Sequence, residues 1–378
     1  KVSNTNIASV TRHEFGNPDK AFKEAENVVE KTFTLQMVHQ GYIEPHNATA
    51  HWDEDDRIKV WTSTQGAFPV RTSTAAILDM DVSRIKVTPL EIGGGFGGKI
   101  PVYLEPVVSI LSKKSGRPVK AIMERSNVFQ ASGPAPGGTI TVKMGTDKDA
   151  NIIAAETSIK LEAGGFPGAA VGAAVQCIFA PYDIPNTRID GYDIVVNKPK
   201  SAAYRAPGSP QAAFAAETVS DELARIHNMD PIDFRLQNAS KEDTRRADGV
   251  VFPKIGNVEV LEAAKASDHW KSDLGTPPKG RVRGRGVASG YWFNVGLKSA
   301  VSLTVNNDGS VALVEGSTDI GGTRTSISMQ AAEVLGIGVE NFIPSVGDTD
   351  TAGYADVTGG SRTTYATGFA AVKAAENL

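Results

Sequence analysis

The sequence contains almost no cysteine: Cys177 is the single one among 378 residues. One thiol cannot form a disulfide within the chain, and it cannot alone hold an iron–sulfur cluster or a four-ligand structural zinc. We therefore expect a reducing, cytoplasmic setting. Long apolar runs are also missing, since no stretch approaches 18 consecutive apolar residues. A membrane span is not expected.

Neither sign of charge is in large excess. The 39 basic and 43 acidic residues leave a net charge of −4, and no run of lysine or arginine is present. A nucleic-acid partner is therefore not expected, because its phosphates require concentrated positive charge. Residues 1–19 carry no apolar core of a signal peptide. The sequence lacks an initial Met and stops inside an alanine-rich stretch that starts at Ala366, so we treat both ends as cut.

Two stretches of the chain repeat one pattern. In the first, a strand at 57–61 is followed by a small-residue loop, a helix that ends at Leu78 and a strand at 84–87. In the second, a strand at 311–314 is followed by a similar loop, a helix that ends at Leu335 and a strand near Phe342. The repeat predicts an α+β protein with two related α/β lobes. The loops are rich in Ser, Thr and Gly, whose backbone N–H groups can face an anion.

The rest of the chain connects these lobes. Strands at 139–144 and 152–161 flank a turn and predict a hairpin. Residues 211–227, opened by Pro210, place Phe214, Val219, Leu223 and Ile226 near helical spacing, which predicts a packed helix. Gly, Pro and Lys gather at 275–286. We therefore predict a first lobe at 1–274, a linker at 275–286 and the start of a second lobe at 287–378.

The glycine-rich segment Gly93–Ile100 follows the predicted strand. It resembles a P-loop, but Ile100 stands where a Mg²⁺-binding Ser or Thr is required. It also resembles a dinucleotide fingerprint, but no acid lies about 20 residues further on. Five glycines around Phe96 indicate that the backbone approaches another group closely. A tight structural turn remains the alternative to a ligand site.

Three other features leave two interpretations open. Arg205 has little acid near it in sequence, which favours an anionic ligand, although a lone arginine before a helix is commonly a surface residue. The spacing of His39, His46 and His51 matches no standard zinc pattern, so core or surface roles are favoured. Cys177 has no activating base nearby in sequence and is expected to be a buried thiol.

Six segments, in this order and spacing, resemble the molybdenum hydroxylases, the family of xanthine dehydrogenase and aldehyde oxidase. The resemblance covers nearly the whole chain. It identifies the chain as a molybdopterin-binding subunit or fragment, with the fold of that family and the cofactor between the two lobes. The segments are Tyr42-Ile43-Glu44-Pro45-His46, Ser63-Thr64-Gln65, Gly93 to Lys99, Ala203 to Gln211, Asp230 to Arg235 and Thr318 to Gly322.

The resemblance implies roles for particular residues. Gln65 would hydrogen-bond an oxo ligand of molybdenum and Arg205 would lie beside an equatorial oxygen, and we expect these two to be catalytic. The metal itself would be held by the pterin and by no side chain. The predicted cofactor-binding residues are Gly95, Phe96, Gly97, Arg205, Ile320, Gly321, Gly322, Gly360, Ser361 and Thr363.

The implied activity is a hydroxylation with water as the oxygen source and a glutamate as general base. The cofactor would be molybdopterin or its cytosine dinucleotide form. Electrons would leave through [2Fe–2S] clusters to FAD, which we expect on an iron–sulfur subunit and a FAD-binding subunit. The family's glutamate falls beyond the position that matches Leu378. We therefore expect a second chain or a missing segment to supply it.

Departures from the family bear on the substrate. Purine-oxidising members have a glutamate where this chain has Ile100 and a phenylalanine where it has Pro207, so xanthine is not expected. Carbon monoxide dehydrogenases have a copper-binding cysteine where this chain has Ala206. Tyr291 and Trp292 match substrate-contacting positions, which favours an aldehyde or an aromatic N-heterocycle. The alternative is a cofactor-binding or scaffold subunit without chemistry of its own.

Overall fold

The computed structural model describes residues 4–378 of the protein. They form two compact units, each assembled from three separate stretches of chain. Unit 1 takes the described residues up to Val38, Pro136–Ser201 and Ala206–Trp292; unit 2 takes His39–Ala135, Ala202–Arg205 and Phe293–Leu378. The units therefore do not coincide with the predicted first lobe (1–274), linker (275–286) and second lobe (287–378). That division of the chain stays a prediction.

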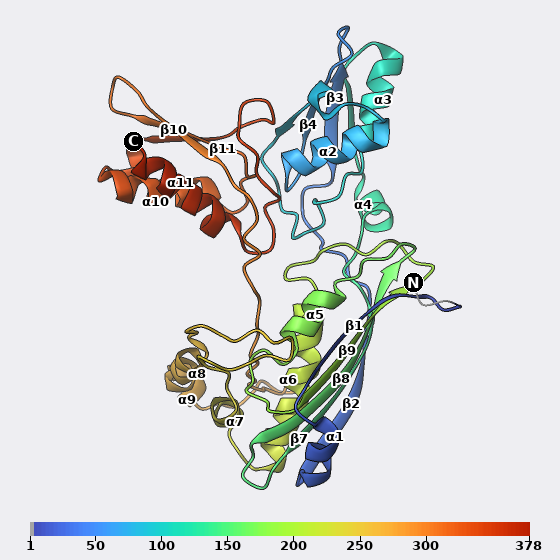
Figure 1. The fold of residues 1–378 in the computed structure, drawn as a ribbon, viewed down its shortest axis with the longest axis vertical. Coiled ribbons are helices and arrows are strands. Elements are labelled where there is room, and N and C mark those ends of the chain that lie inside the picture. The colour runs from blue at the N-terminus through green and yellow to red at the C-terminus, as the bar shows by residue number, and fades with distance from the viewer. Residues whose placement is uncertain (1–3) are drawn as a thin grey trace. The chain divides into compact units, whose positions relative to one another are not determined.

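Unit 1 is built on a five-stranded sheet in the order β1-β9-β8-β7-β2 (Figure 1). The predicted hairpin is confirmed, because β7 and β8 pair antiparallel. Its turn is fixed by Asp147, whose Oδ1 accepts hydrogen bonds from the N–H groups of Asp149 and Asn151 at 2.9 Å. The strands are β1 (Ile7–Phe15), β2 (Asn27–Leu35), β7 (Gly138–Thr146), β8 (Ile152–Gly164) and β9 (Thr187–Val195).

Helix α6 (Ser209–Ile226) packs along one face of this sheet, as Figure 1 shows. Pro210 lies in its first turn, as predicted, and Val219 and Leu223 are buried. The expected burial of Phe214 and Ile226 is wrong: they are 53% and 47% exposed. The other helices of the unit are α1 (Pro18–Glu24), α5 (Val171–Cys177), α7 (Pro231–Gln237), α8 (Asn257–Ala266) and α9 (Asp268–Lys271).

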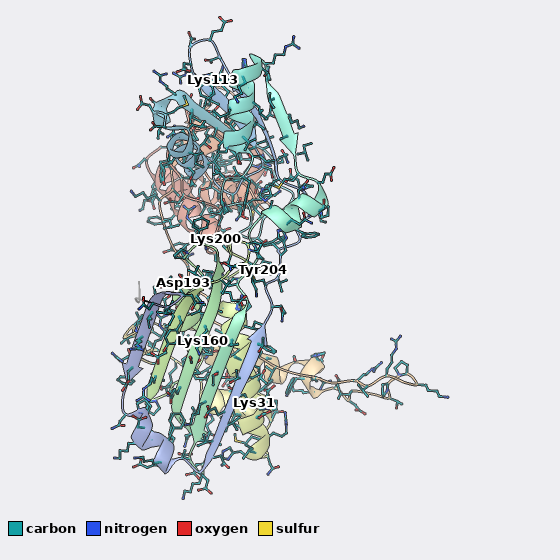
Figure 2. The ribbon with its side chains drawn as sticks, turned by 90° about the vertical axis from the view of Figure 1, so that its right-hand side faces the viewer. Lys31, Lys113, Lys160, Asp193, Lys200 and Tyr204 are labelled. Carbon is teal, nitrogen blue, oxygen red and sulfur yellow. The ribbon has the colours of Figure 1, made fainter. Side chains whose placement is uncertain are left out.

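The opposite face of the sheet carries polar side chains (Figure 2). Arg12 pairs with Asp190 of the neighbouring strand at 2.9 Å, and Arg188 reaches Glu14 and Asp19 at 3.0 and 2.9 Å. Exposed ion pairs of this kind contribute roughly 0–1 kcal/mol each. This face is therefore a solvated surface, while the unit's apolar core lies between the sheet and α6.

A buried ion pair joins α6 to α7. The side chain of Arg235 is fully buried, and its Nε donates to Glu217 Oε2 at 2.8 Å. Tyr182 donates to the other carboxylate oxygen at 2.6 Å. Arg235, the last residue of the Asp230–Arg235 segment, therefore has a structural role: it holds α7 on α6.

Cys177 ends α5 and is buried, as predicted. Burial raises the pKa of its thiol to about 11. At pH 8 about one thiol in a thousand would then be ionised. We expect the native protein to react with a disulfide reagent such as DTNB only when it unfolds, followed as absorbance at 412 nm with and without denaturant. Complete reaction of the native protein within minutes would contradict this.

Unit 2 contains both copies of the predicted repeat (Figure 1). In each copy two strands pair in parallel with a helix between them: β4, α2, β5 in the first and β11, α10, β12 in the second. The first copy belongs to a four-stranded sheet, β5-β4-β3-β6, and the second to a three-stranded sheet, β10-β11-β12. Thr349 joins the copies, because its N–H donates to Val87 O and its Oγ1 accepts from Val87 N.

The elements of unit 2 have the following bounds. The first copy and its neighbours comprise β3 (Asn47–Trp52), β4 (Ile58–Thr62), α2 (Ala67–Leu78), a 3-10 turn (Val82–Arg84), β5 (Ile85–Pro89), α3 (Glu105–Ser115), β6 (Val119–Ile122) and α4 (Arg125–Ala131). The second comprises β10 (Val301–Val305), β11 (Val311–Glu315), α10 (Thr323–Leu335), a 3-10 turn (Val339–Asn341), β12 (Phe342–Val346), a π-helical turn (Thr363–Thr367) and α11 (Gly368–Glu376).

The alanine-rich helix expected from Ala366 starts as an α-helix at Gly368. The preceding turn is π-helical. None of the helices in residues 4–378 is long and apolar enough to cross a membrane.

Candidate functional site

The glycine-rich loop follows β5 and lies against a second segment of unit 2. Phe96 O accepts a hydrogen bond from Arg205 N at 2.8 Å. Gly97 has a φ of +105°, and a Cβ built on it would lie 2.4 Å from Ala203 O. No side chain fits in that space or adopts that φ without strain. The predicted close approach of this backbone is thus, in part, an approach to another loop of the protein.

Gln65, which follows β4, holds the glycine-rich loop with its side chain. Its Oε1 accepts from Gly97 N at 2.9 Å and from Lys99 N at 3.2 Å. Its Nε2 donates to Thr358 O at 2.8 Å. Because two N–H groups face one side of the amide and a carbonyl faces the other, the amide orientation is fixed. One N–H of Nε2 is left to donate to a ligand.

We expect Gln65→Ala to destabilise the protein by about 2 kcal/mol, because it leaves two backbone N–H groups of the loop without their acceptor in a buried place. Gln65 itself is 3% exposed. The measurement is urea unfolding monitored by circular dichroism. The matched control is Gln237→Ala on the surface of unit 1, where the side chain donates to Asp149 O in an exposed place. Equal unfolding midpoints for the two variants would contradict the anchoring role of Gln65.

The loop of the second repeat lies near the same amide. Thr358 Oγ1 donates to Thr318 O at 2.6 Å, so Gln65, Thr358 and Thr318 form one chain of contacts within unit 2. Gly321 and Gly322, which precede α10, are exposed and have φ of +72° and +85°. The structure thus links Gln65, through Thr358, to Thr318, which lies two residues before the predicted segment 320–322.

Two hydroxyls in this region have no partner. Thr318 and Thr363 are 1% and 5% exposed, and neither Oγ1 has a hydrogen-bond partner among residues 4–378. Leaving such a group buried and unpaired costs about 1–3 kcal/mol. A polar ligand that accepts from them would remove that cost. The sequence predicts Thr363 as a cofactor contact, whereas Thr318 belongs to a motif in which the sequence gives it no role.

The remaining second-lobe candidates form a tight turn. Gly360 has a φ of +70° and its carbonyl accepts from Val295 N at 3.2 Å. Ser361 has a φ of +58° and accepts a hydrogen bond at its carbonyl from Asn294 Nδ2 at 2.8 Å. Positive φ at a residue with a side chain is strained and concentrates at ligand sites.

Arg205 also has a positive φ, +29°. The residue is exposed, and its guanidinium has no hydrogen bond or ion pair with any residue of the described chain. Its side chain therefore pairs with no carboxylate among residues 4–378. Five N–H donors in a planar fork are free to bind an anion.

The predicted substrate residues are divided between the units. Ile100 belongs to unit 2, whereas Pro207, Tyr291 and Trp292 belong to unit 1. In unit 1 the Tyr291 hydroxyl accepts from Arg246 Nη1 at 2.6 Å, and its ring packs against Phe252. The role of all four as a substrate pocket stays a prediction.

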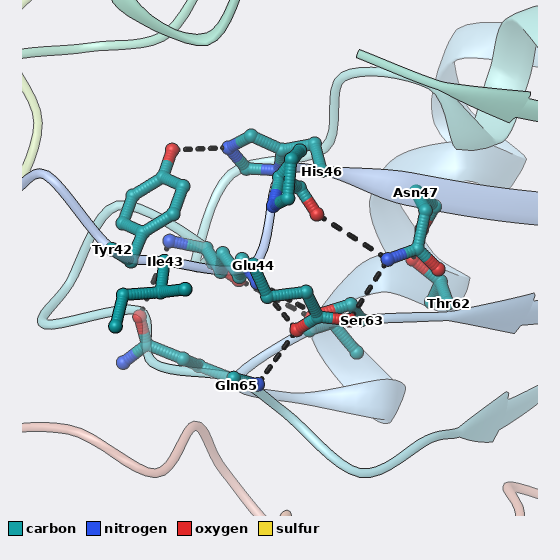
Figure 3. A network of polar contacts seen from close by, with 12 residues as sticks. Tyr42, Ile43, Glu44, His46, Asn47, Thr62, Ser63 and Gln65 are labelled. Atoms are coloured by element: carbon teal, nitrogen blue, oxygen red, sulfur yellow. Dashed lines mark hydrogen bonds and ion pairs between the residues drawn. The ribbon is translucent and has the colours of Figure 1, made fainter. Parts of the chain in front are cut away.

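A polar network to which the sequence gives no role lies behind the glycine-rich loop (Figure 3). The Glu44 carboxylate accepts from Ser63 Oγ, Gly93 N and Lys99 Nζ. Burial alone would raise the pKa of Glu44, but the hydrogen bonds from Lys99, Ser63 and Gly93 lower it to about 2. Lys99 is 1% exposed and faces Glu44, so it is not available to a phosphate as a P-loop lysine would be.

Residues 4–378 contain no group of three or more His, Cys, Asp or Glu side chains placed to hold a metal ion. His46 shares a hydrogen bond of 2.6 Å with the Tyr42 hydroxyl. Burial, followed by the charge of Lys99, lowers the pKa of His46 to about 4. It is a neutral core residue at pH 7.

Two family models match the chain. Both are described as a molybdopterin cofactor-binding domain, and they match residues 2–239 and 259–378. Among known proteins, the nicotinate dehydrogenase large molybdopterin subunit of Eubacterium barkeri is 32% identical over 69% of this chain and 62% of that protein. The molybdenum-binding subunit PaoC of an aldehyde oxidoreductase of Escherichia coli (strain K12) is 30% identical over 88% of this chain and 46% of that subunit.

Solved structures share the fold. The aldehyde oxidoreductase of Desulfovibrio desulfuricans matches 99% of this chain and 43% of its own with a TM-score of 0.86 at 24% identity. A Cu,Mo-containing CO dehydrogenase matches 98% of this chain and 51% of its own with a TM-score of 0.84 at 22% identity. The chain thus spans about half of most of the relatives it matches. It belongs to the xanthine dehydrogenase and aldehyde oxidoreductase family and carries that family's molybdopterin-binding domains.

Proposed function

We propose that this chain forms most of the molybdopterin site of a hydroxylase that oxidises an aldehyde or an aromatic N-heterocycle, with water as the oxygen source. The observation that carries the proposal is that the side chain of Gln65 binds two separate loops of unit 2. Its amide ties the glycine-rich loop at Gly97 to Thr358, and Thr358 contacts the loop of the second repeat. Two loops from related strand-helix-strand units meeting at one amide form a cradle suited to a single extended cofactor.

The residues in this cradle fit the group. Unpaired hydroxyls of Thr318 and Thr363 and the free guanidinium of Arg205 suit an anionic, hydrogen-bonding ligand. The close approach of Gly97 to Ala203 packs the glycine-rich loop against the segment that carries Arg205. When bound, the cofactor would supply a redox-active molybdenum that takes two electrons from the substrate.

Each set of residues has its own part in this proposal. Gln65, with its remaining N–H, and Arg205 orient the reacting end. The proposed residues around the cofactor are Gly95, Phe96 and Gly97 from the first lobe and Ile320, Gly321, Gly322, Gly360, Ser361 and Thr363 from the second.

The substrate class rests on departures within the chain and on its relatives. Ile100 and Pro207 supply no acid or aromatic ring for a purine, and Ala206 supplies no thiolate for copper. Proteins named for nicotinate, nicotine and aldehyde oxidation are among the relatives, although subunits named for xanthine dehydrogenase are 27–29% identical. We propose an apolar-walled pocket that selects planar rings or aldehydes.

The proposed enzyme is completed by other polypeptides. The single buried Cys177 cannot hold an iron–sulfur cluster, so an iron–sulfur subunit and a FAD-binding subunit would carry electrons away. A further segment or chain would provide the general-base glutamate. The pterin would be bound as molybdopterin or as its cytosine dinucleotide.

The test is metal and pterin analysis of the native assembly that contains this chain, with mass spectrometry of its subunits. We expect about one molybdenum and one pterin for each copy of the chain, since there is one cradle per copy. A folded assembly with neither would overturn the proposal in favour of a scaffold subunit. Turnover of benzaldehyde, nicotinate and xanthine in H₂¹⁸O then tests the substrate class, with label expected in the first or second product and no xanthine turnover.

A further inference from the structure

One carboxylate holds both ends of the glycine-rich loop. Glu44 Oε2 accepts from the N–H of Gly93, the first residue of the loop, at 2.6 Å and from Nζ of Lys99, near its end, at 2.7 Å. Ser63 Oγ donates to the same oxygen at 2.7 Å. Figure 3 labels Glu44 and Ser63 of this network. A loop whose two ends meet at a single oxygen has little freedom to change its span.

The other carboxylate oxygen fixes Glu44 itself. Its Oε1 accepts from Asn47 Nδ2 at 2.9 Å, and Asn47 begins β3. The backbone N–H of Glu44 also donates to Gly93 O at 3.2 Å. The carboxylate is therefore attached to the sheet on one side and to the loop on the other, so the position of the loop is set by the sheet.

Lys99 transmits this position to Gln65. Its ammonium group is buried and donates to Glu44 and, at 2.9 Å, to Ser63 Oγ. Its backbone N–H donates to Gln65 Oε1 at 3.2 Å, and its carbonyl accepts from Gln65 N at 3.0 Å. A displacement of Lys99 would move both the amide and the backbone of Gln65.

We propose that Glu44 and Lys99 are positioning residues, a clasp that holds Gly95–Gly97 and the Gln65 amide in the arrangement that accepts the cofactor. This inference rests on the proposed function, because it assigns the clasp to that same site. In this proposal both residues act through the glycine-rich loop and Gln65. The clasp differs from an ordinary buried ion pair in one respect: its loss should affect cofactor retention more than it affects stability.

The experiment compares Glu44→Asp with Glu105→Asp in the complete native assembly. Both are glutamates of unit 2 with hydrogen bonds to a side chain and to a backbone N–H, but Glu105 bonds Thr62 and Tyr103 rather than the loop. Each substitution keeps the charge and withdraws the carboxylate by about 1.5 Å, one C–C bond. Only the change at Glu44 withdraws the oxygen that accepts from both Gly93 N and Lys99 Nζ.

Three readouts are taken from each variant: the thermal midpoint, the pterin released per folded chain, measured by fluorescence after oxidation, and the Mo(V) EPR spectrum. We expect at least a fivefold loss of pterin and a changed EPR spectrum in Glu44→Asp. We expect wild-type pterin content in Glu105→Asp even where the two midpoints fall equally. Equal pterin loss in both variants, or wild-type pterin and spectrum in Glu44→Asp, would overturn the clasp.

The double variant Glu44→Met/Lys99→Met provides a second test, because it leaves no buried charge unpaired. We expect its pterin content to stay at least fivefold low, whatever its midpoint. Recovery of pterin to the wild-type level would overturn the positioning role. If the wild-type assembly itself contains no pterin, it is the proposed function that fails, and the comparison of variants is not reached.

Discussion

Replacing Gly97 with alanine is expected to remove at least nine-tenths of the bound pterin. The added Cβ would lie 2.4 Å from Ala203 O, and the backbone φ of +105° would be strained as well. Ala203 O is itself held by Gln40 Nε2 at 2.7 Å, so it cannot yield freely. The loop must therefore move away from 203–205, which breaks the hydrogen bond of Gly97 N to Gln65.

Gly116→Ala is the matched control, because Gly116 also has a positive φ, +62°, but nothing lies within 4 Å of the position that its Cβ would take. It carries the strain of the left-handed backbone, about 1–2 kcal/mol, without a clash. The measurement is pterin and molybdenum per folded chain in both variants. Equal cofactor content in the two would show that the close approach at Gly97 does not matter for the site.

Glu315→Gln is expected to make the protein more stable, by an amount that grows with pH. Glu315 is the last residue of β11 and is 0% exposed. Neither oxygen of its carboxyl group has a hydrogen-bond partner among residues 4–378. Burial, and then the charge of Asp319, raise the pKa of Glu315 to about 8, against the opposing effect of Arg324. The carboxyl group is therefore protonated in the native protein at pH 7.

The direction in which stability changes with pH follows from proton binding. The unfolded chain releases this proton near pH 4.5, whereas the native protein keeps it up to about pH 8, so stability falls as pH rises between these values. We expect Glu315→Gln and wild type to differ little at pH 4.5 and the variant to be more stable by roughly 4 kcal/mol at pH 9. Denaturant unfolding at several pH values measures this. The exposed Glu333→Gln of α10 is the control, and a constant difference across pH would contradict the prediction.

The periodic elements of the fold could be predicted from the sequence because their signals are local. The hairpin of β7 and β8, both strand-helix-strand repeats and α6 lie where alternation and helical spacing indicate. Phe214 shows the limit of that reasoning. Helical spacing predicts a packed residue, yet it is 53% exposed and meets Phe33 of β2 edge-on. Helical spacing identifies the face of a helix that packs, but the burial of each residue on that face depends on where the neighbouring elements lie.

The contacts of the site could not be predicted, because they join residues far apart in sequence. Glu44 and Lys99 both lie in motifs, but no motif indicates their pairing across 55 positions. The sequence indicates Gln65 as a ligand contact, whereas the structure also gives its amide two bonds to the glycine-rich loop and one to Thr358. A motif identifies residues that matter together without saying which of them hold one another.

The interleaving of the two units has a consequence for how the protein is made. Strand β2 ends at Leu35, but its partner β7 begins only at Gly138, and β1 pairs with the still later β9. At a translation rate of about 5–20 residues per second, β2 waits on the order of 5–20 s for β7 to be synthesised. During that time it is an unpaired edge, open to association with other chains. Codon changes that speed translation between Leu35 and Gly138 shorten this interval and should therefore raise the soluble yield of the protein.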